Sequence, residues 1–275
     1  MSSNKIINSS LIDLSERALN NIYRDIFDYS GDENNYKHLL KPEYFFNTYL
    51  SQSLVNNYKN KYFFRFELTY KEILSFILIY DKNRTFASNE EVTFLYNSLR
   101  KKNISEEEKN YINSYFSSFQ GRKNGSIDIT ILEKSYNGLT DGIPRVLIEL
   151  KTDSDRMDAI KEDIQRIADF IVWNINSNKG NLNTLKEGHS IIVGNKKHLK
   201  RIKSCYKQII KNYDSAYFSS KIIQKTIQII DSTFDPTPGE NPTRIVYEIG
   251  CTVISFVRNN GDKVATENQN NHEQS

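Results

Sequence analysis

The sequence predicts an α/β fold, and three features of its central part lead to that prediction. Residues 125–131 and 146–151 are short runs with the alternation and the β-branched content of strands. Residues 157–171 carry apolar side chains at helical spacing and are expected to form the crossover helix. The apolar run 190–193 then supplies a further strand, so the chain passes from strands to a helix and back to a strand.

The first two strands are predicted to pair as an antiparallel hairpin, because an Asn-Gly and an Asp-Gly turn dipeptide lie between them. Side chains alternate along a strand, so Ile127 and Ile129 are expected on one face and Asp128 on the other. In the second strand the same alternation places Glu149 and Lys151 together. Pairing then brings the three charged groups to one face of the sheet, with Asp128 close to Glu149.

Two carboxylates on a partly apolar sheet face need a compensating cation. They repel each other and are poorly solvated, so one takes up a proton unless positive charge is supplied. Oxygen ligands without nearby Cys or His favour Mg²⁺ over zinc, with Mn²⁺ as a substitute. Lys151 could then orient or deprotonate a water molecule, or stabilise charge on an attacked phosphate. The competing interpretation, a surface sheet with solvated charges, is disfavoured because both faces of each strand carry apolar residues.

The pattern of Asp128 followed by Glu149-x-Lys151, each on a predicted strand, resembles the PD-(D/E)xK nuclease superfamily, whose fold is called restriction-endonuclease-like. The resemblance covers residues 42–194 and implies a core ordered as helix, three strands, helix, strand. Ile127 replaces the proline of the family's name and leaves the aspartate intact. In this chain the core would carry extra N-terminal helices and an additional C-terminal strand.

The resemblance also implies roles for individual residues. The acidic pair would bind the metal, the Leu150 backbone carbonyl would add a ligand, and Lys151 would assist the nucleophile. Relatives often carry a glutamate on the helix before the first core strand. Glu43 is the candidate for that position, because Pro42 suits the first turn of a helix. Glu67 is the rival and ranks second, since it lies in an alternating, strand-like run.

Charged residues outside these strands are assigned to binding or to structure. Seven basic residues and no acid occur between positions 196 and 211, on a predicted helix. A phosphate-binding face and an ordinary solvated helix fit this run equally well. On the crossover helix, Asp163 and Arg166 predict an intrahelical ion pair, although relatives often place charged residues here that approach the site. The candidate nucleic-acid contacts are Arg122, Lys123, Lys196, Lys197 and Lys200.

Composition indicates a soluble cytoplasmic protein. A chain of 275 residues with 38% hydrophobic content can form one sizeable core, so residues 1–258 are predicted to form a single domain. Residues 259–275 are rich in Asn, Gln and Glu and are predicted to be a disordered tail. The two cysteines lie far apart, and no apolar stretch reaches the ~18 residues of a membrane span. The net charge of +3 does not by itself indicate a nucleic-acid binder.

The predicted function is that of a Mg²⁺-dependent nuclease. Most of the resembled superfamily acts on DNA, which puts DNA ahead of RNA, and a role in restriction, phage defence or repair follows from analogy alone. Two alternatives stay open: a catalytically silent nucleic-acid-binding or assembly module with the same fold, and a nucleotide hydrolase with the same metal pair. Cutting both strands calls for two active sites, which a homodimer would supply. No membrane association is expected, and a protein partner is left open.

Overall fold

Six strands in the described part of the chain form one mixed sheet. The computed structural model describes residues 11–30, 42–70, 72–74, 76–77, 105–106, 110, 125–134, 142–152, 155–176, 184–231 and 244–259. The strand order is β1-β2-β3-β4-β6-β5. The strands are β1 (Tyr62–Thr69), β2 (Ser126–Glu133), β3 (Ile143–Thr152), β4 (Glu187–Asn195), β5 (Phe218–Asp231) and β6 (Arg244–Arg258). The predicted α/β class is confirmed.

The pairing of the strands follows their connections. β1, β2 and β3 form an antiparallel meander, so the predicted pairing of the two central strands is confirmed. The crossover through a helix makes β4 parallel to β3, as short turns cannot connect parallel neighbours. β6 is antiparallel to β4, and β5 closes the other edge of the sheet as the antiparallel partner of β6.

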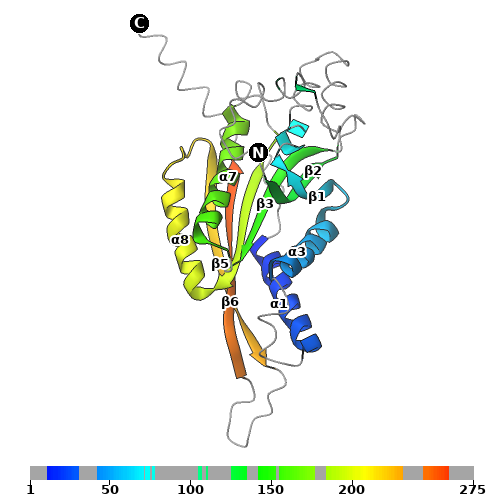
Figure 1. The fold of residues 1–275 in the computed structure, drawn as a ribbon, viewed down its shortest axis with the longest axis vertical. Helices are drawn as coiled ribbons and strands as arrows, with labels where there is room; N and C mark the ends of the chain where they lie inside the picture. The colour runs from blue at the N-terminus through cyan, green and yellow to red at the C-terminus, as the bar shows by residue number, and fades with distance from the viewer. Residues whose placement is uncertain are drawn as a thin grey trace, which may run out of the picture.

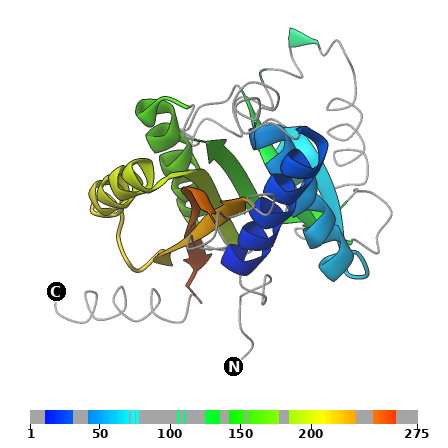
Figure 2. The same cartoon turned by 90° about the horizontal axis from the view of Figure 1, so that it is seen from below.

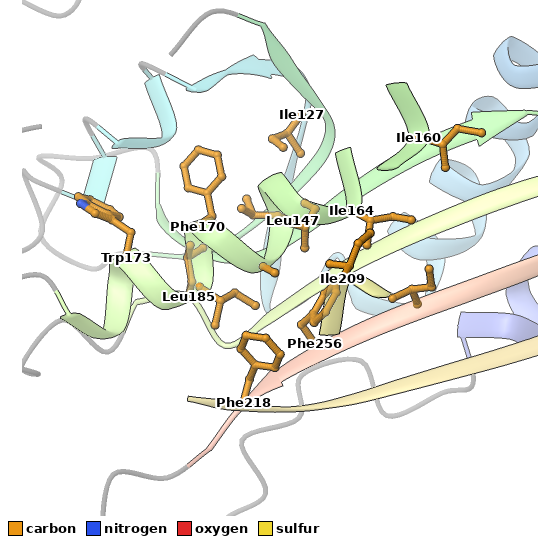
Figure 3. Close-up of a cluster of buried hydrophobic side chains, with 14 of the residues drawn as sticks. Ile127, Leu147, Ile160, Ile164, Phe170, Trp173, Leu185, Ile209, Phe218 and Phe256 are labelled. Atoms are coloured by element: carbon orange, nitrogen blue, oxygen red, sulfur yellow. The ribbon is translucent and has the colours of Figure 1, made fainter. Parts of the chain in front are cut away.

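Helices cover both faces of this sheet (Figures 1 and 2). On one face lie α7 (Met157–Asn176) and α8 (Lys196–Ile210), which contact β3, β4 and β6. On the other lie α1 (Leu11–Ser30) and α3 (Pro42–Tyr58). Each face has its own apolar cluster, and Figure 3 shows the one beneath α7 and α8. Among the described residues, no helix is both long and apolar enough to span a membrane.

Local sequence explains how closely the helices approach the sheet. Phe46, Leu50 and Leu54 recur on one side of α3 and are almost fully buried, as the helical pattern predicts. On the other face, Gly188 of β4 lets α7 come close, because a Cβ at this position would lie 2.4 Å from a methyl carbon of Ile167. The packing of α7 therefore depends on the missing side chain in β4.

Two predictions about the strands are wrong. Ile127 does not share a face with Ile129: it packs in the cluster under α7, whereas Ile129 packs toward α3. Ile127 lies beyond the last backbone pair of β2 with β3, where strict alternation no longer holds. The C-terminal part contributes two strands and not one, since β5 precedes β6. Serine, lysine and glutamine are interspersed with isoleucine along β5, an edge strand, so its apolar content is diluted.

The predicted tail begins with a residue that is held in place. Asn259 donates its backbone N–H to the carbonyl of Tyr217 at 3.1 Å, and its side-chain amide donates to the Ser215 carbonyl at 2.7 Å. The other predicted tail residues, 260–275, lie outside the described residues.

Candidate functional site

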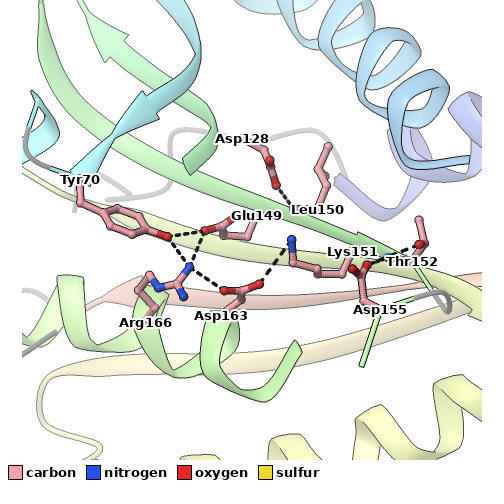
Figure 4. A network of polar contacts seen from close by, with 9 residues as sticks. All are labelled: Tyr70, Asp128, Glu149, Leu150, Lys151, Thr152, Asp155, Asp163 and Arg166. Carbon is pink, nitrogen blue, oxygen red and sulfur yellow. Dashed lines mark hydrogen bonds and ion pairs between the residues drawn. The ribbon is translucent and has the colours of Figure 1, made fainter. Parts of the chain in front are cut away.

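The site is built at the carboxyl end of β3, on the face that α7 covers (Figure 4). Alternation along this strand puts Glu149 and Lys151 on one face, as predicted, and both side chains contact α7 there. Glu149 is 3% exposed, whereas Lys151 is only partly buried. A buried carboxylate and a partly exposed ammonium thus stand two residues apart on one strand.

Asp128 reaches this site from the neighbouring strand. The last backbone pair between β2 and β3 joins Ile129 and Ile148. One residue further, the Asp128 carboxylate accepts a hydrogen bond from the backbone N–H of Leu150 at 2.6 Å. A side chain therefore takes the place of a main-chain acceptor where the two strands separate. This bond fixes Asp128 next to Glu149.

Helix α7 contributes two charged side chains that complete the cluster. Asp163 Oδ1 lies 2.6 Å from Arg166 Nη1, so the predicted intrahelical pair is confirmed. The pair is not an ordinary solvated one, because both side chains are only 10% exposed. Asp163 Oδ2 lies 3.4 Å from Lys151 Nζ, and Arg166 Nη1 lies 3.4 Å from Glu149 Oε1.

Tyr70 is a site residue that the sequence interpretation missed. Its hydroxyl donates to Glu149 Oε1 at 3.2 Å and accepts a short hydrogen bond from Arg166. A capping box starts the helical turn that carries it: the Glu72 carboxylate accepts from the backbone N–H of Thr69, and the Thr69 hydroxyl accepts from the backbone N–H of Glu72. The T-x-x-E spacing directly after a strand-like run was the available signal.

A glycine makes room for the tyrosine ring. Gly125 has φ +121°, and a Cβ there would lie 2.9 Å from the Tyr70 ring. The Gly125 carbonyl also accepts a hydrogen bond from the Tyr70 backbone N–H at 3.1 Å. Gly125 lies directly before β2 and three residues before Asp128, and it therefore positions Tyr70 at the start of this strand.

The charges of this cluster do not balance. Asp128, Glu149 and Asp163 are three carboxyl groups, against the two cations Lys151 and Arg166. Burial raises the pKa of Glu149 well above its usual range, and the neighbouring Asp128 raises it further, while Lys151 opposes the rise. Burial and the nearby Glu149 also raise the pKa of Tyr70, which keeps its hydroxyl a donor. The cluster thus favours one more proton or a bound cation.

The remaining predicted residues lie apart from this cluster or outside the described part. Glu43 is in the first turn of α3, but its side chain is not among those described. Glu67 is exposed on edge strand β1 with φ +53°, and it is not on a helix. Arg122 and Lys123 lie outside the described residues. The other three predicted nucleic-acid contacts are exposed at the start of α8: Lys196, Lys197 and Lys200.

Two carboxylates of this cluster, those of Asp128 and Glu149, are suited to bind a hard divalent cation. In the part of the chain that the structure describes, no group of three Asp, Glu, His or Cys side chains is arranged to hold a metal. Asp128 and Glu149 contribute oxygen atoms, which Mg²⁺ and Mn²⁺ prefer, and the excess negative charge around them agrees with such an ion. No family model matches the chain, and no curated protein is significantly similar to it.

Proposed function

We propose that this protein is a metal-dependent nuclease that hydrolyses phosphodiester bonds of nucleic acid, with DNA ahead of RNA. The observation that carries the proposal is the pair of Asp128 and Glu149 on neighbouring strands, with Lys151 on the same strand as Glu149. The order of elements from α3 through β1, β2, β3 and α7 to β4 supports a restriction-endonuclease-like fold, since it follows the helix, three strands, helix, strand order of that superfamily.

Asp128 and Glu149 would hold a Mg²⁺ ion, with the Leu150 carbonyl as a third ligand. The bound metal would lower the pKa of a water molecule and stabilise negative charge on the attacked phosphate. The excess of carboxylates over cations makes the site selective for positive charge. Because Glu149 is buried, bulk water has little access to its carboxylate. Its electrostatic interactions are therefore stronger than they would be in water.

The side chains around the acidic pair have separate tasks. Tyr70 and Arg166 both contact Glu149 Oε1, so they fix the orientation of this carboxylate and leave its second oxygen for a ligand. Asp163 holds the Lys151 ammonium, which is partly exposed and can meet a phosphate oxygen or a nucleophilic water. Fixing such groups before the substrate binds avoids reorganisation during the reaction.

The proposal is tested by cleavage of supercoiled plasmid and of labelled single-stranded DNA and RNA. Wild type, Lys151→Ala and the surface control Lys221→Ala are compared with Mg²⁺, Mn²⁺ or EDTA. Lys221 is exposed on β5, far from this site in the sheet order. Metal-dependent cutting by wild type and control that is lost in Lys151→Ala supports the nuclease. Equal cutting by all three proteins points to a contaminant and contradicts it.

Two further measurements separate the alternatives. If Mn²⁺ raises the melting temperature of wild type but not of Asp128→Ala, the acidic pair binds metal, because a ligand specific for the native state stabilises it. Metal binding without cleavage of any polynucleotide, but with release of phosphate from nucleotides, favours a nucleotide hydrolase. If the protein shows neither cleavage nor metal binding, the results favour a nucleic-acid-binding or assembly module.

A further inference from the structure

Helix α8 concentrates positive charge on its outer side. The segment 196–211, which is α8 with its C-cap Lys211, has seven basic residues and no acidic one, so the rest of the chain has four more acidic than basic residues. All seven are exposed, whereas the inner side of the helix is committed to the core through residues such as Leu199, Ile202 and Ile209. The small net charge of the protein therefore conceals a strongly polarised surface.

In the described part of the chain, most of these cations have no carboxylate within ion-pair distance. Lys196 lies 3.3 Å from Glu248, in an exposed pair. Within the described residues, the other six form no ion pair. Lys225 on β5 shows the contrast, because it lies 2.5 Å from Asp13 and 2.7 Å from Glu16. Six neighbouring cations without carboxylates repel one another, and an external anion relieves this repulsion.

Five of the lysines form a line along the helix, which we call the lysine stripe. Their spacing of four, three, four and four residues keeps them within one narrow sector of a helix with 3.6 residues per turn. The stripe is about 22 Å long at 1.5 Å per residue, which equals about six base-pair steps of a duplex. Its members are Lys196, Lys200, Lys203, Lys207 and Lys211.

The start of the stripe lies near the candidate site. Lys151 is paired in register with Ile192 of β4, and Lys196 follows four residues later, about 13 Å along the chain. Asn195 ends β4 and caps α8, since its side chain accepts a hydrogen bond from the His198 backbone N–H at 3.0 Å. The tight cap turns the chain directly from the sheet into the basic helix.

We propose that the lysine stripe binds the sugar-phosphate backbone of nucleic acid without reading its sequence. A linear row of lysines suits a linear row of phosphates, and each lysine that neutralises a phosphate releases counterions. An anionic membrane is the less suitable partner, because the outer side of α8 presents no large apolar residue for insertion. Binding by the stripe does not depend on the proposed nuclease activity; only the link between stripe and cleavage rests on it.

The test is binding of the full chain to labelled nucleic acid in EDTA, where metal-dependent cleavage cannot occur. Fluorescence anisotropy with a duplex of about 20 base pairs, longer than the stripe, is recorded over a range of salt concentrations. The triple variant Lys200→Gln, Lys203→Gln and Lys207→Gln is compared with a control that loses the same charge elsewhere. That control replaces the exposed residues Lys59, Lys61 and Lys221 by glutamine.

We expect the stripe variant to lose roughly 100-fold in affinity at 0.1 M salt and to lower the slope of log K against log salt by about 2.7, because three phosphate contacts are lost. The charge-matched control should keep both values. Replacing the same three residues by arginine should preserve binding, which excludes misfolding as the cause of the loss. Single-stranded DNA and duplex RNA in the same assay show which backbone the stripe prefers.

Two results would overturn the proposal. One is an equal loss of affinity in the stripe variant and in the control, which would show that the lower net charge alone explains the loss. The other is no binding of wild type to any polynucleotide at low salt, together with stripe-dependent binding to vesicles that contain phosphatidylserine, which would assign α8 to a membrane surface. Binding that is lost in the stripe variant while wild type fails to cleave would keep this proposal and reject the nuclease.

Discussion

The carboxylate of Asp163 lies 3.4 Å from the ammonium of Lys151, so helix α7 holds the cation of strand β3 in place. The same carboxylate lies 2.6 Å from Arg166, which in turn contacts Glu149. Asp163 thus forms an ion pair with each of the two cations of the site, Lys151 and Arg166. Loss of its charge should therefore disturb the site more than loss of an exposed acid on the same helix.

We expect Asp163→Asn to lower kcat of the proposed nuclease by roughly 10- to 100-fold, the usual effect of removing a group that orients a site residue. KM should change by less than about threefold, since the substrate does not depend on Asp163 for binding. Initial rates over a range of substrate concentrations check this split. Asp158→Asn, exposed in the first turn of α7, is the matched control. An unchanged kcat in Asp163→Asn would show that Lys151 needs no such support.

Glu149→Gln should make the protein more stable at neutral pH. Because burial raises the pKa of Glu149, the folded protein holds this proton to higher pH than the unfolded chain does. Wild type therefore loses stability as pH rises from about 4.5, the ordinary value, and the variant does not. Urea unfolding at pH 7 should show a gain on the order of 1 kcal/mol, with no gain at pH 4. A less stable variant at pH 7 would mean that the contacts of the Glu149 carboxylate with Arg166 and Tyr70 stabilise the folded state more than burial of the charge destabilises it.

The sequence predicts best those elements in which apolar and polar residues follow a clear pattern. The runs that contain Asp128 and Glu149 have strong alternation between turn signals, and both form strands that pair as expected. Strand β5 lacks that contrast, since polar residues are interspersed among its isoleucines without a regular period. The helix predicted over the basic run after β4 is confirmed, and basic and apolar residues separate cleanly around it.

The candidate site could be predicted where its residues lie on one regular element or on two strands joined by recognisable turn signals. Glu149 and Lys151 share one strand, and alternation alone brings them together. Tyr70 lies 79 residues before Glu149, and its contact depends on the sheet order and on a close backbone approach that periodicity does not reveal. The i, i+3 spacing of Asp163 and Arg166 predicted their pair but not their burial, which α7 acquires by packing on the sheet, chiefly on β4 and β3.

Gly125→Ala should destabilise the protein by about 1 to 3 kcal/mol. The backbone at this glycine has φ +121°, which other residues rarely adopt, and the added methyl group would meet the Tyr70 ring. Thermal unfolding measures the loss, and Ser126→Ala next to it is the control. A variant as stable as wild type would show that Tyr70 can move without cost.

Lys186→Met tests a second charged cluster at the opposite end of β3. Burial lowers the pKa of Lys186 to about 8, and the neighbouring Arg145 and Arg258 add to this shift. The unfolded chain binds the proton up to about pH 10.5 and the folded chain only up to about 8, so the charge destabilises the folded state below pH 8. The free energy of unfolding of wild type should therefore rise between pH 8 and pH 10.5.

The methionine variant should be more stable than wild type at pH 7, because it removes a cation that repels two arginines. Its advantage should shrink above pH 8 and vanish only above about pH 10.5, where Lys186 becomes neutral in both states. Urea unfolding at pH 7, 9 and 10 gives the comparison, and Lys221→Met, on an exposed strand position, should show no such trend. An advantage that stays constant with pH would instead assign the gain to apolar packing.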